Sequence, residues 1–363
     1  MLSKLFYIAS FSLIPLFLPP QISAKPTSVV AQVNKLELNN LLLVGRKYVE
    51  SQDYDKALET YKRAADLDQK NPKIFSGIGY VQTLREDYSG AVEAYIQAIA
   101  LEPDNSQLHY ALGFSLGNLG NNEAAAAAYQ QAIALEPDNI QNYMGLGVVL
   151  IRADEYDRAI VVYQQIMALD PDNLEAFKIT SQILIAQQRY PEAIALLQTV
   201  IEQQPYNSDL KLQLAKAQLE TGDTEAGLAT LELAKQTAPQ NHVIYLQIGN
   251  VLSQQGELDA ALAEYKWAAR LEPSASSAIA GMGNVYLAQK RYSQAIINFR
   301  RLIQITPESP LGHHNLGLAL HARRRNKEAI VALEQALKIY EDNSNQAKAD
   351  EVAGLMAEIS ENL

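Results

Sequence analysis

Small, aromatic and polar residues follow one another along most of the chain in a pattern that repeats every 34 residues. Nine units of that length begin at residues 38, 72, 106, 140, 174, 208, 242, 276 and 310. The eighth place of every unit is a small residue, usually glycine, and the twentieth is alanine or glycine. Two helices can approach closely at such places, because no bulky side chain holds their axes apart. The pattern therefore predicts closely packed helices in every unit.

Two further positions fix where each unit ends. An aromatic residue or leucine occupies the twenty-fourth place, from Tyr61 in the first unit to Leu333 in the last, and would fill the space between successive units. Prolines stand at 103, 137, 171, 205, 239, 273 and 307. Proline lacks an amide donor and clashes with the preceding turn, so each ends the second helix of its unit. Three glycines fall between the two helices, where a turn needs permissive backbone: Gly120, Gly222 and Gly256.

This combination of small, aromatic, alanine and proline places resembles the tetratricopeptide repeat family over residues 38 to about 343. The resemblance implies an all-α fold: about nine helix-turn-helix units stacked into a right-handed superhelical solenoid with a concave groove. Residues 32–37 would lead into the first unit. Residues 344–363 would form a capping helix over the open end of the stack, which repeat proteins need for solubility.

The first residues are typical of an export signal. Lys4 precedes an uncharged stretch from Leu5 to Leu18, and small-residue cleavage sites follow at Ala24 and at Ala31. The alternative is an uncleaved membrane anchor over residues 5–24, but prolines interrupt that segment and its apolar run is short for a span. We expect residues 1–31 to be a signal peptide and the protein to be exported to the periplasm or an equivalent envelope compartment. Membrane contact is then expected only if this segment stays uncleaved.

Composition narrows the classes of function. Hydrophobic residues make up 48% and charged residues 20% of the chain, which argues against wholesale disorder. The formal charge of −11 argues against a nucleic-acid partner, because such proteins concentrate positive charge to neutralise phosphates. The chain has no cysteine, which excludes disulfides and thiolate chemistry.

Catalytic and metal-binding constellations are not evident. His314 and His321 stand seven residues apart, about 10 Å along a helix, whereas two zinc ligands on one helix need a spacing of three or four. Carboxylates such as Glu102 and Glu136 recur with the repeat and are therefore structural. The helical units account for nearly every residue after 37, which leaves no room for a catalytic domain. We expect no enzyme activity, no metal and no cofactor.

The resemblance implies where a partner would bind. In the family, the first helix of each unit lines the groove at its second, fifth, ninth and twelfth places. Mapped onto units two to four, these places give an apolar strip of six residues: Tyr80, Tyr110, Phe114, Met144, Val148 and Ile151. Such a strip usually marks an interaction site, and aromatic residues and methionine favour binding. The alternative is that these side chains pack against neighbouring repeats.

The groove of the later units is predicted to be polar, with Asn250, Asn284, His314 and His321 along it. Some family members hold a chaperone's terminal carboxylate with cations and asparagines. Here Val243 and Leu246 stand where the cations would be needed, so that role is disfavoured.

One basic cluster, Arg323, Arg324 and Arg325, falls in the turn between the helices of unit nine. It is either a solvated turn or a docking point for an acidic partner or anionic lipid headgroups.

These observations predict a scaffold or adaptor that binds a peptide or helix of another protein in the groove. A second hypothesis is an accessory subunit of an envelope assembly or modifying enzyme complex whose catalytic activity lies on another chain. A third is self-association through the ends of the stack. All three hypotheses rest on one property of repeat proteins: they have a long surface whose side chains can vary without disturbing the residues that pack the helices.

Overall fold

The computed structural model describes residues 29–361, with side chains described from residue 35, and within this range the regular elements are all α-helices joined by short turns, without strands. The predicted signal or anchor at residues 1–31 lies largely outside the described residues. The first helix begins at Val29, so residues 32–37, expected only to lead into the first unit, are part of it. Among the described residues, no helix combines the length and apolar character that crossing a membrane requires.

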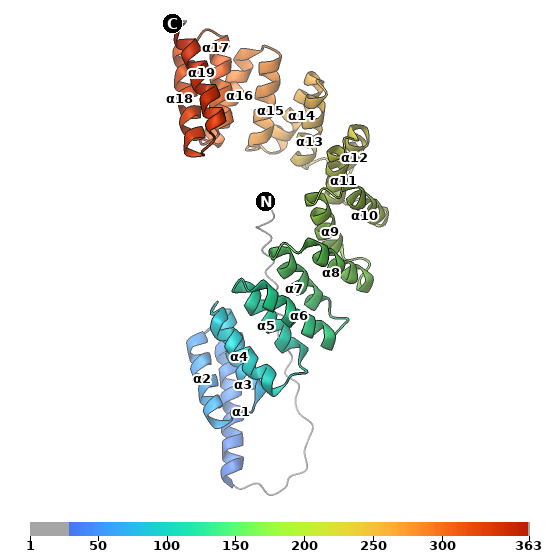
Figure 1. Ribbon diagram of the computed structural model, residues 1–363, viewed down its shortest axis with the longest axis vertical. Coiled ribbons are helices and arrows are strands. Elements are labelled where there is room, and N and C mark those ends of the chain that lie inside the picture. Colours follow the sequence, from blue (N-terminus) through green and yellow to red (C-terminus); the bar gives the residue numbers. More distant parts are fainter. Residues whose placement is uncertain (1–28, 362–363) are drawn as a thin grey trace. The chain divides into compact units, whose positions relative to one another are not determined.

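The helices alternate as first and second members of antiparallel pairs (Figure 1). The first helices are α1 (Val29–Glu50), α3 (Pro72–Leu84), α5 (Ser106–Asn118), α7 (Ile140–Arg152), α9 (Leu174–Ala186), α11 (Ser208–Glu220), α13 (His242–Gln254), α15 (Ser276–Ala288) and α17 (Pro310–Ala322). The second helices are α2 (Tyr54–Leu67), α4 (Tyr88–Leu101), α6 (Asn122–Leu135), α8 (Tyr156–Leu169), α10 (Tyr190–Gln203), α12 (Thr224–Thr237), α14 (Leu258–Leu271), α16 (Tyr292–Ile305) and α18 (Asn326–Asp342). A last helix, α19 (Gln346–Glu361), follows α18.

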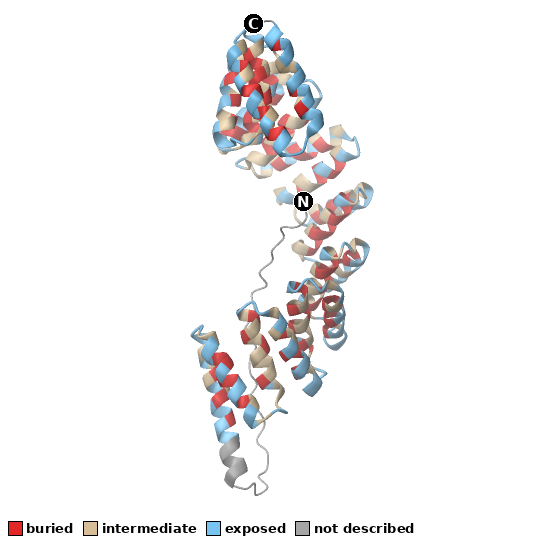
Figure 2. Ribbon diagram, turned by 60° about the vertical axis from the view of Figure 1, so that its left-hand side comes forward, coloured by how far each residue is buried: buried red, intermediate tan, exposed pale blue. Residues whose placement is uncertain are grey.

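The chain divides into two compact bodies, one ending at Ile183 and the next beginning at Leu184, so that the boundary falls within α9. In each body, buried positions line the sides on which helices meet, while turns and outer sides are exposed (Figure 2). The predicted all-α solenoid of helical repeats is confirmed.

Rings packed on glycines connect neighbouring units. Tyr129 of α6 lies against Gly113 in its own unit and against Gly145 in the next. Tyr265 of α14 lies in the same way between Gly249 and Gly281. A Cβ on Gly145, Gly249 or Gly281 would come within 2.8 Å of the ring, and one on Gly113 would come to 3.0 Å. The ring therefore requires a small residue at the eighth place of its own unit and glycine at the sixth place of the next.

Local hydrogen bonds set the ends of the helices. The asparagine that closes a unit accepts a backbone hydrogen bond and caps the next first helix, as Asn105 does for α5 and Asn241 for α13. This satisfies amide groups that a helix start leaves without partners. The turn inside each pair contains one residue of positive φ, at the place where Gly120, Gly222 and Gly256 stand in three of the units. In the other six units that residue is not glycine, as at Lys290.

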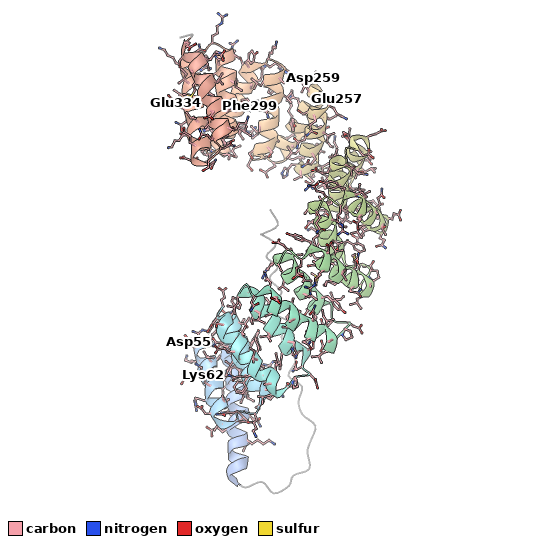
Figure 3. The ribbon with its side chains drawn as sticks, viewed as in Figure 1. Asp55, Lys62, Glu257, Asp259, Phe299 and Glu334 are labelled. Carbon is pink, nitrogen blue, oxygen red and sulfur yellow. The ribbon has the colours of Figure 1, made fainter. Side chains whose placement is uncertain are left out.

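The helix α19 covers α18 at the end of the chain. Val352 and Ile359 are fully buried, and Leu355 and Met356 pack against the same core. That core continues through the C-terminal body to Phe299 of α16 (Figure 3) and Tyr265 of α14.

Candidate functional site

The six residues of the predicted apolar strip lie on three first helices of the N-terminal body, α3, α5 and α7. Helix α5 contacts both of the others. All six side chains are partly exposed: Tyr80, Tyr110, Phe114, Met144, Val148 and Ile151. Because α5 contacts both other helices, we refer to these six positions together as the α3–α5–α7 face.

Two aromatic contacts hold the centre of this face. The Tyr110 ring meets Tyr129 edge-on, with 5.5 Å between centroids, and Phe114 meets Tyr88 of α4 at 6.3 Å. Edge-to-face pairs at such distances are favourable. Tyr110 and Phe114 thus take part in repeat packing as well as being partly exposed, so the two interpretations of the strip both apply to them.

A buried polar cluster fixes α5 relative to α7. The amide nitrogen of Asn142 donates to the Ser106 hydroxyl at 3.3 Å and to the carbonyl of Ala132 at 3.1 Å. At the other end of the helices, Arg152 Nη1 donates to the Gly117 carbonyl at 3.1 Å. Buried hydrogen bonds of this kind are costly to break. The spacing between the two helices is therefore held at both ends.

The α3–α5–α7 face carries no ionised tyrosine at neutral pH. Burial raises the pKa of the Tyr110 phenol above its ordinary value, and burial does the same for Tyr80. A partner segment lying on this face would meet neutral, apolar or weakly polar side chains.

The polar residues of the later units are engaged with protein groups. Asn250 Oδ1 accepts a hydrogen bond from Tyr265 at 2.9 Å, and Asn284 Oδ1 accepts one from Asn315 at 2.9 Å. His321 Nδ1 lies 3.0 Å from Asn326 Oδ1. Asn284 is exposed, whereas Asn250 and His321 are half-buried.

The expectation that His314 lines an accessible wall is wrong. Its side chain is only 6% exposed and meets Tyr340 of α18 edge-on. Burial lowers the pKa of His314, and the charges of Glu351 and Lys348 on α19 also act on it. The burial arises because α18 and α19 pack around this position, which the repeat register alone does not reveal.

Arg323, Arg324 and Arg325 lie exposed on the turn between α17 and α18. Arg325 is ion-paired with Glu328 at 2.6 Å, and Glu328 is also 3.2 Å from Arg300 of α16. In the part of the chain that the structure describes, no group of three or more His, Asp or Glu side chains is arranged to hold a metal ion.

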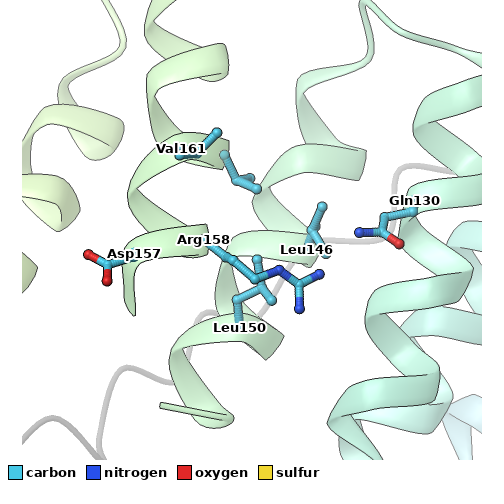
Figure 4. Close-up of a pocket in the computed structure, with 7 residues that line it drawn as sticks. Gln130, Leu146, Leu150, Asp157, Arg158 and Val161 are labelled. Atoms are coloured by element: carbon cyan, nitrogen blue, oxygen red, sulfur yellow. The ribbon is translucent and has the colours of Figure 1, made fainter. Parts of the chain in front are cut away.

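The structure also shows hollows between successive second helices that the sequence analysis did not identify. One, of about 370 Å³, is lined by Gln130 of α6, Leu146 and Leu150 of α7, and Arg158 and Val161 of α8 (Figure 4). A second, of about 560 Å³, lies between α16 and α18. The available signal was an aliphatic residue at the twenty-second place, where most units have alanine or glutamate: Val161, Val331 and, in unit eight, Ile297.

The fold and these surfaces define a helical-repeat protein. Its partly exposed side chains stand at the same places on the first helices of successive units. Tetratricopeptide repeat models match residues 118–183, 184–247, 242–274 and 314–343, and a TPR repeat model matches residues 45–84, 83–120 and 283–323. The chain belongs to the tetratricopeptide repeat family.

Solved structures with the same kind of fold are distant. Yeast Tom70 is 13% identical, with 91% of this chain and 96% of that chain covered and a TM-score of 0.49. A tetratricopeptide repeat protein from Parabacteroides merdae ATCC 43184 is 17% identical, with 69% and 98% covered and a TM-score of 0.46. MamA is 21% identical, with 46% and 96% covered and a TM-score of 0.43. The search of curated proteins gave no match.

Proposed function

We propose that this chain is a non-catalytic scaffold that binds a peptide or helix of a partner protein on the α3–α5–α7 face. The observation that carries the proposal is the partial exposure of six apolar side chains on three contacting helices. A contiguous apolar surface of this kind usually marks an interaction site. Tetratricopeptide repeats support a protein-interaction scaffold in general, and the partial exposure of these side chains supports this face as its binding surface.

The chemistry of the face indicates the class of partner. Tyr80, Tyr110 and Phe114 supply rigid aromatic area, while Met144 adapts its shape to an irregular apolar partner. The phenols are neutral at physiological pH, so affinity would come from apolar burial and shape rather than from ion pairs. An amphipathic helix or an extended apolar peptide fits these properties.

Charge placed on the face tests the proposal. The double substitution Met144→Glu and Val148→Glu puts two carboxylates on adjacent turns of α7, and we expect it to abolish partner capture from an envelope extract. Gln131→Glu adds a carboxylate at an exposed place on the second helix α6, away from the face, and should leave capture unchanged. Capture that survives the double substitution, with helicity retained, would refute the proposal. A single stoichiometric enzyme among the captured proteins would favour the accessory-subunit role over a general adaptor.

Export to an envelope compartment is part of the proposal. It rests on the basic, apolar and small-residue order of residues 1–31. Cleavage after Ala24 would leave α1 whole, whereas cleavage after Ala31 would remove its first turn. Sequencing the amino terminus of the mature protein tests this, and we expect it to begin at Lys25. An unprocessed terminus in the membrane fraction would instead indicate the anchor.

A further inference from the structure

The hollow between α16 and α18 differs in place and chemistry from the α3–α5–α7 face. It lies on the side of the second helices, has a volume of about 560 Å³, and is lined by Ile303, Leu316, Leu320 and Val331. Val331 is 59% exposed, whereas Leu316 and Leu320 are buried at the base. A partner's apolar side chain could bury its surface against the exposed Val331 and the leucines beneath it.

Two cations line this hollow, and three more precede it in the sequence. Arg300 and Lys327 line it, and the turn that precedes Lys327 carries Arg323, Arg324 and Arg325. The carboxylate at the rim, Glu328, is held by Arg325 and Arg300. The hydrogen bond from Arg325 is the largest cause that lowers the pKa of Glu328, which therefore stays ionised and paired. The charged lining residues and the adjacent turn together hold five cations and one carboxylate, which leaves an excess of positive charge here in a chain whose formal charge is −11.

The equivalent hollow of unit four shows that the fold does not require these cations. It uses the same places of the repeat, with Leu146 and Leu150 below Val161. At the place of Lys327, however, it has Asp157, and its turn carries Asp154 and Glu155 instead of the arginines. Arg158 stands at the place of Glu328 and is paired with Glu155. The excess of cations at the hollow of unit nine is therefore not required by a hollow of this geometry.

We propose that the hollow between α16 and α18 binds an acidic peptide segment of a partner protein that carries a bulky apolar side chain. The apolar side chain would contact Val331 above Leu316 and Leu320, and the flanking carboxylates would pair with Lys327 and Arg323. Guanidinium groups suit this task, because their planar donors bind carboxylates in pairs. This site is independent of the α3–α5–α7 face, and either could exist without the other.

A peptide fits the pattern of charge better than an anionic membrane does. The turn of unit eight carries Lys290 and Arg291, whereas the corresponding segments of units six and seven, in the same body, carry Asp223, Glu225, Glu257 and Asp259. Glu257 and Asp259 lie together where α13 is followed by α14 (Figure 3). A broad anionic surface laid across the turns of this body would be repelled by the carboxylates of units six and seven, whereas a short segment contacts only the basic turns of units eight and nine.

Three labelled short peptides of equal length test the proposal on the full chain: one of glutamate and leucine, one of lysine and leucine, and one of glutamate and serine. Fluorescence anisotropy should show that the first peptide binds at least about tenfold more tightly than the other two. It alone has both carboxylates to pair with the cations and leucines to contact the apolar residues of the hollow. Equal binding of the first and third peptides, or of the first and second, would overturn the proposal.

Matched variants locate the binding. Lys327→Glu with Arg323→Glu should weaken the glutamate–leucine peptide at least about tenfold, and so should Val331→Asp. Val161→Asp makes the same change in the hollow of unit four and should have no effect. Unchanged binding in the unit-nine variants, or equal loss in Val161→Asp, would overturn the assignment. So would phosphatidylglycerol vesicles that bind through Lys327 and Arg323 and displace the peptide. Because none of these changes touches the α3–α5–α7 face, failure here is distinct from failure of the proposed function.

Discussion

The ring of Tyr265 lies so close to Gly281 of the next unit that a Cβ on this glycine would come within 2.6 Å of the ring's Cζ atom. On its other side the same ring lies against Gly249, and its hydroxyl donates to Asn250. One residue thereby joins two successive units and is fixed by a hydrogen bond. The contact explains why glycine stands at both positions, since any side chain would separate α14 from α15.

Gly281→Ala should therefore destabilise the C-terminal body by about 1–3 kcal/mol, the usual cost of overpacking a well-filled core. The measurement is urea unfolding followed by far-UV circular dichroism. Gly354→Ala is the matched control: its Cβ meets nothing within 4 Å, and alanine favours a helix interior by roughly 0.5–1 kcal/mol. Equal effects of the two substitutions would show that the ring contact does not govern stability.

A substitution in the turn between α13 and α14 shows the effect of backbone conformation on stability separately from that of side-chain packing. Gly256 has a φ of +81° and no atom within 4 Å of a Cβ built on it. Gly256→Ala should cost about 1 kcal/mol, because the left-handed region is unfavourable for L-residues. Lys290→Gly, at the equivalent place of the next unit with φ 57°, should be neutral or stabilising. A stabilising Gly256→Ala would contradict the conformational explanation.

The start of α15 lacks the cap that most first helices have. Ala275 precedes it and makes no side-chain hydrogen bond, whereas Asn241 accepts from the amide of Val243 at the start of α13. Ala275→Asn should raise the free energy of unfolding by about 1 kcal/mol, and Asn241→Ala should lower it by a similar amount. Thermal unfolding of both variants measures the two effects, and shifts of the same sign would count against the capping interpretation.

Acid should loosen the packing of α17 against α18 and α19. The pKa of His314 is lowered by burial, so the folded protein binds its proton less readily than the unfolded chain does. Stability from this residue is complete above the unfolded pKa of about 6.5 and falls as the pH drops towards the folded pKa. His314→Gln should flatten the pH dependence of urea unfolding in that window. An unchanged pH profile in the variant would rule out His314 as the source.

The fold was largely predictable because the residues that recur every 34 positions are the ones that pack the helices against one another. Glycine at places such as Gly249 and an aromatic ring at places such as Tyr265 are two halves of one contact, and their regular spacing predicts paired helices. The left-handed turn was predictable where glycine marks it, as at Gly256, but not at Lys290, where the same backbone carries a side chain.

The surfaces were less predictable, because they depend on which helices cover which positions. His314 occupies a groove place of the repeat but is buried at the end of the C-terminal body. The hollow below Val331 is formed by residues of α16, α17 and α18 together, so no single unit shows it. The binding role of the α3–α5–α7 face stays a prediction.

The central claim is that a partner lies on the α3–α5–α7 face, and site-specific photocrosslinking tests it most directly. A photoreactive phenylalanine at Phe114 should give a crosslinked partner peptide by mass spectrometry, whereas the same group at the exposed Gln131 of α6 should give none. Partner crosslinks that appear at Gln131 and not at Phe114 would contradict the account.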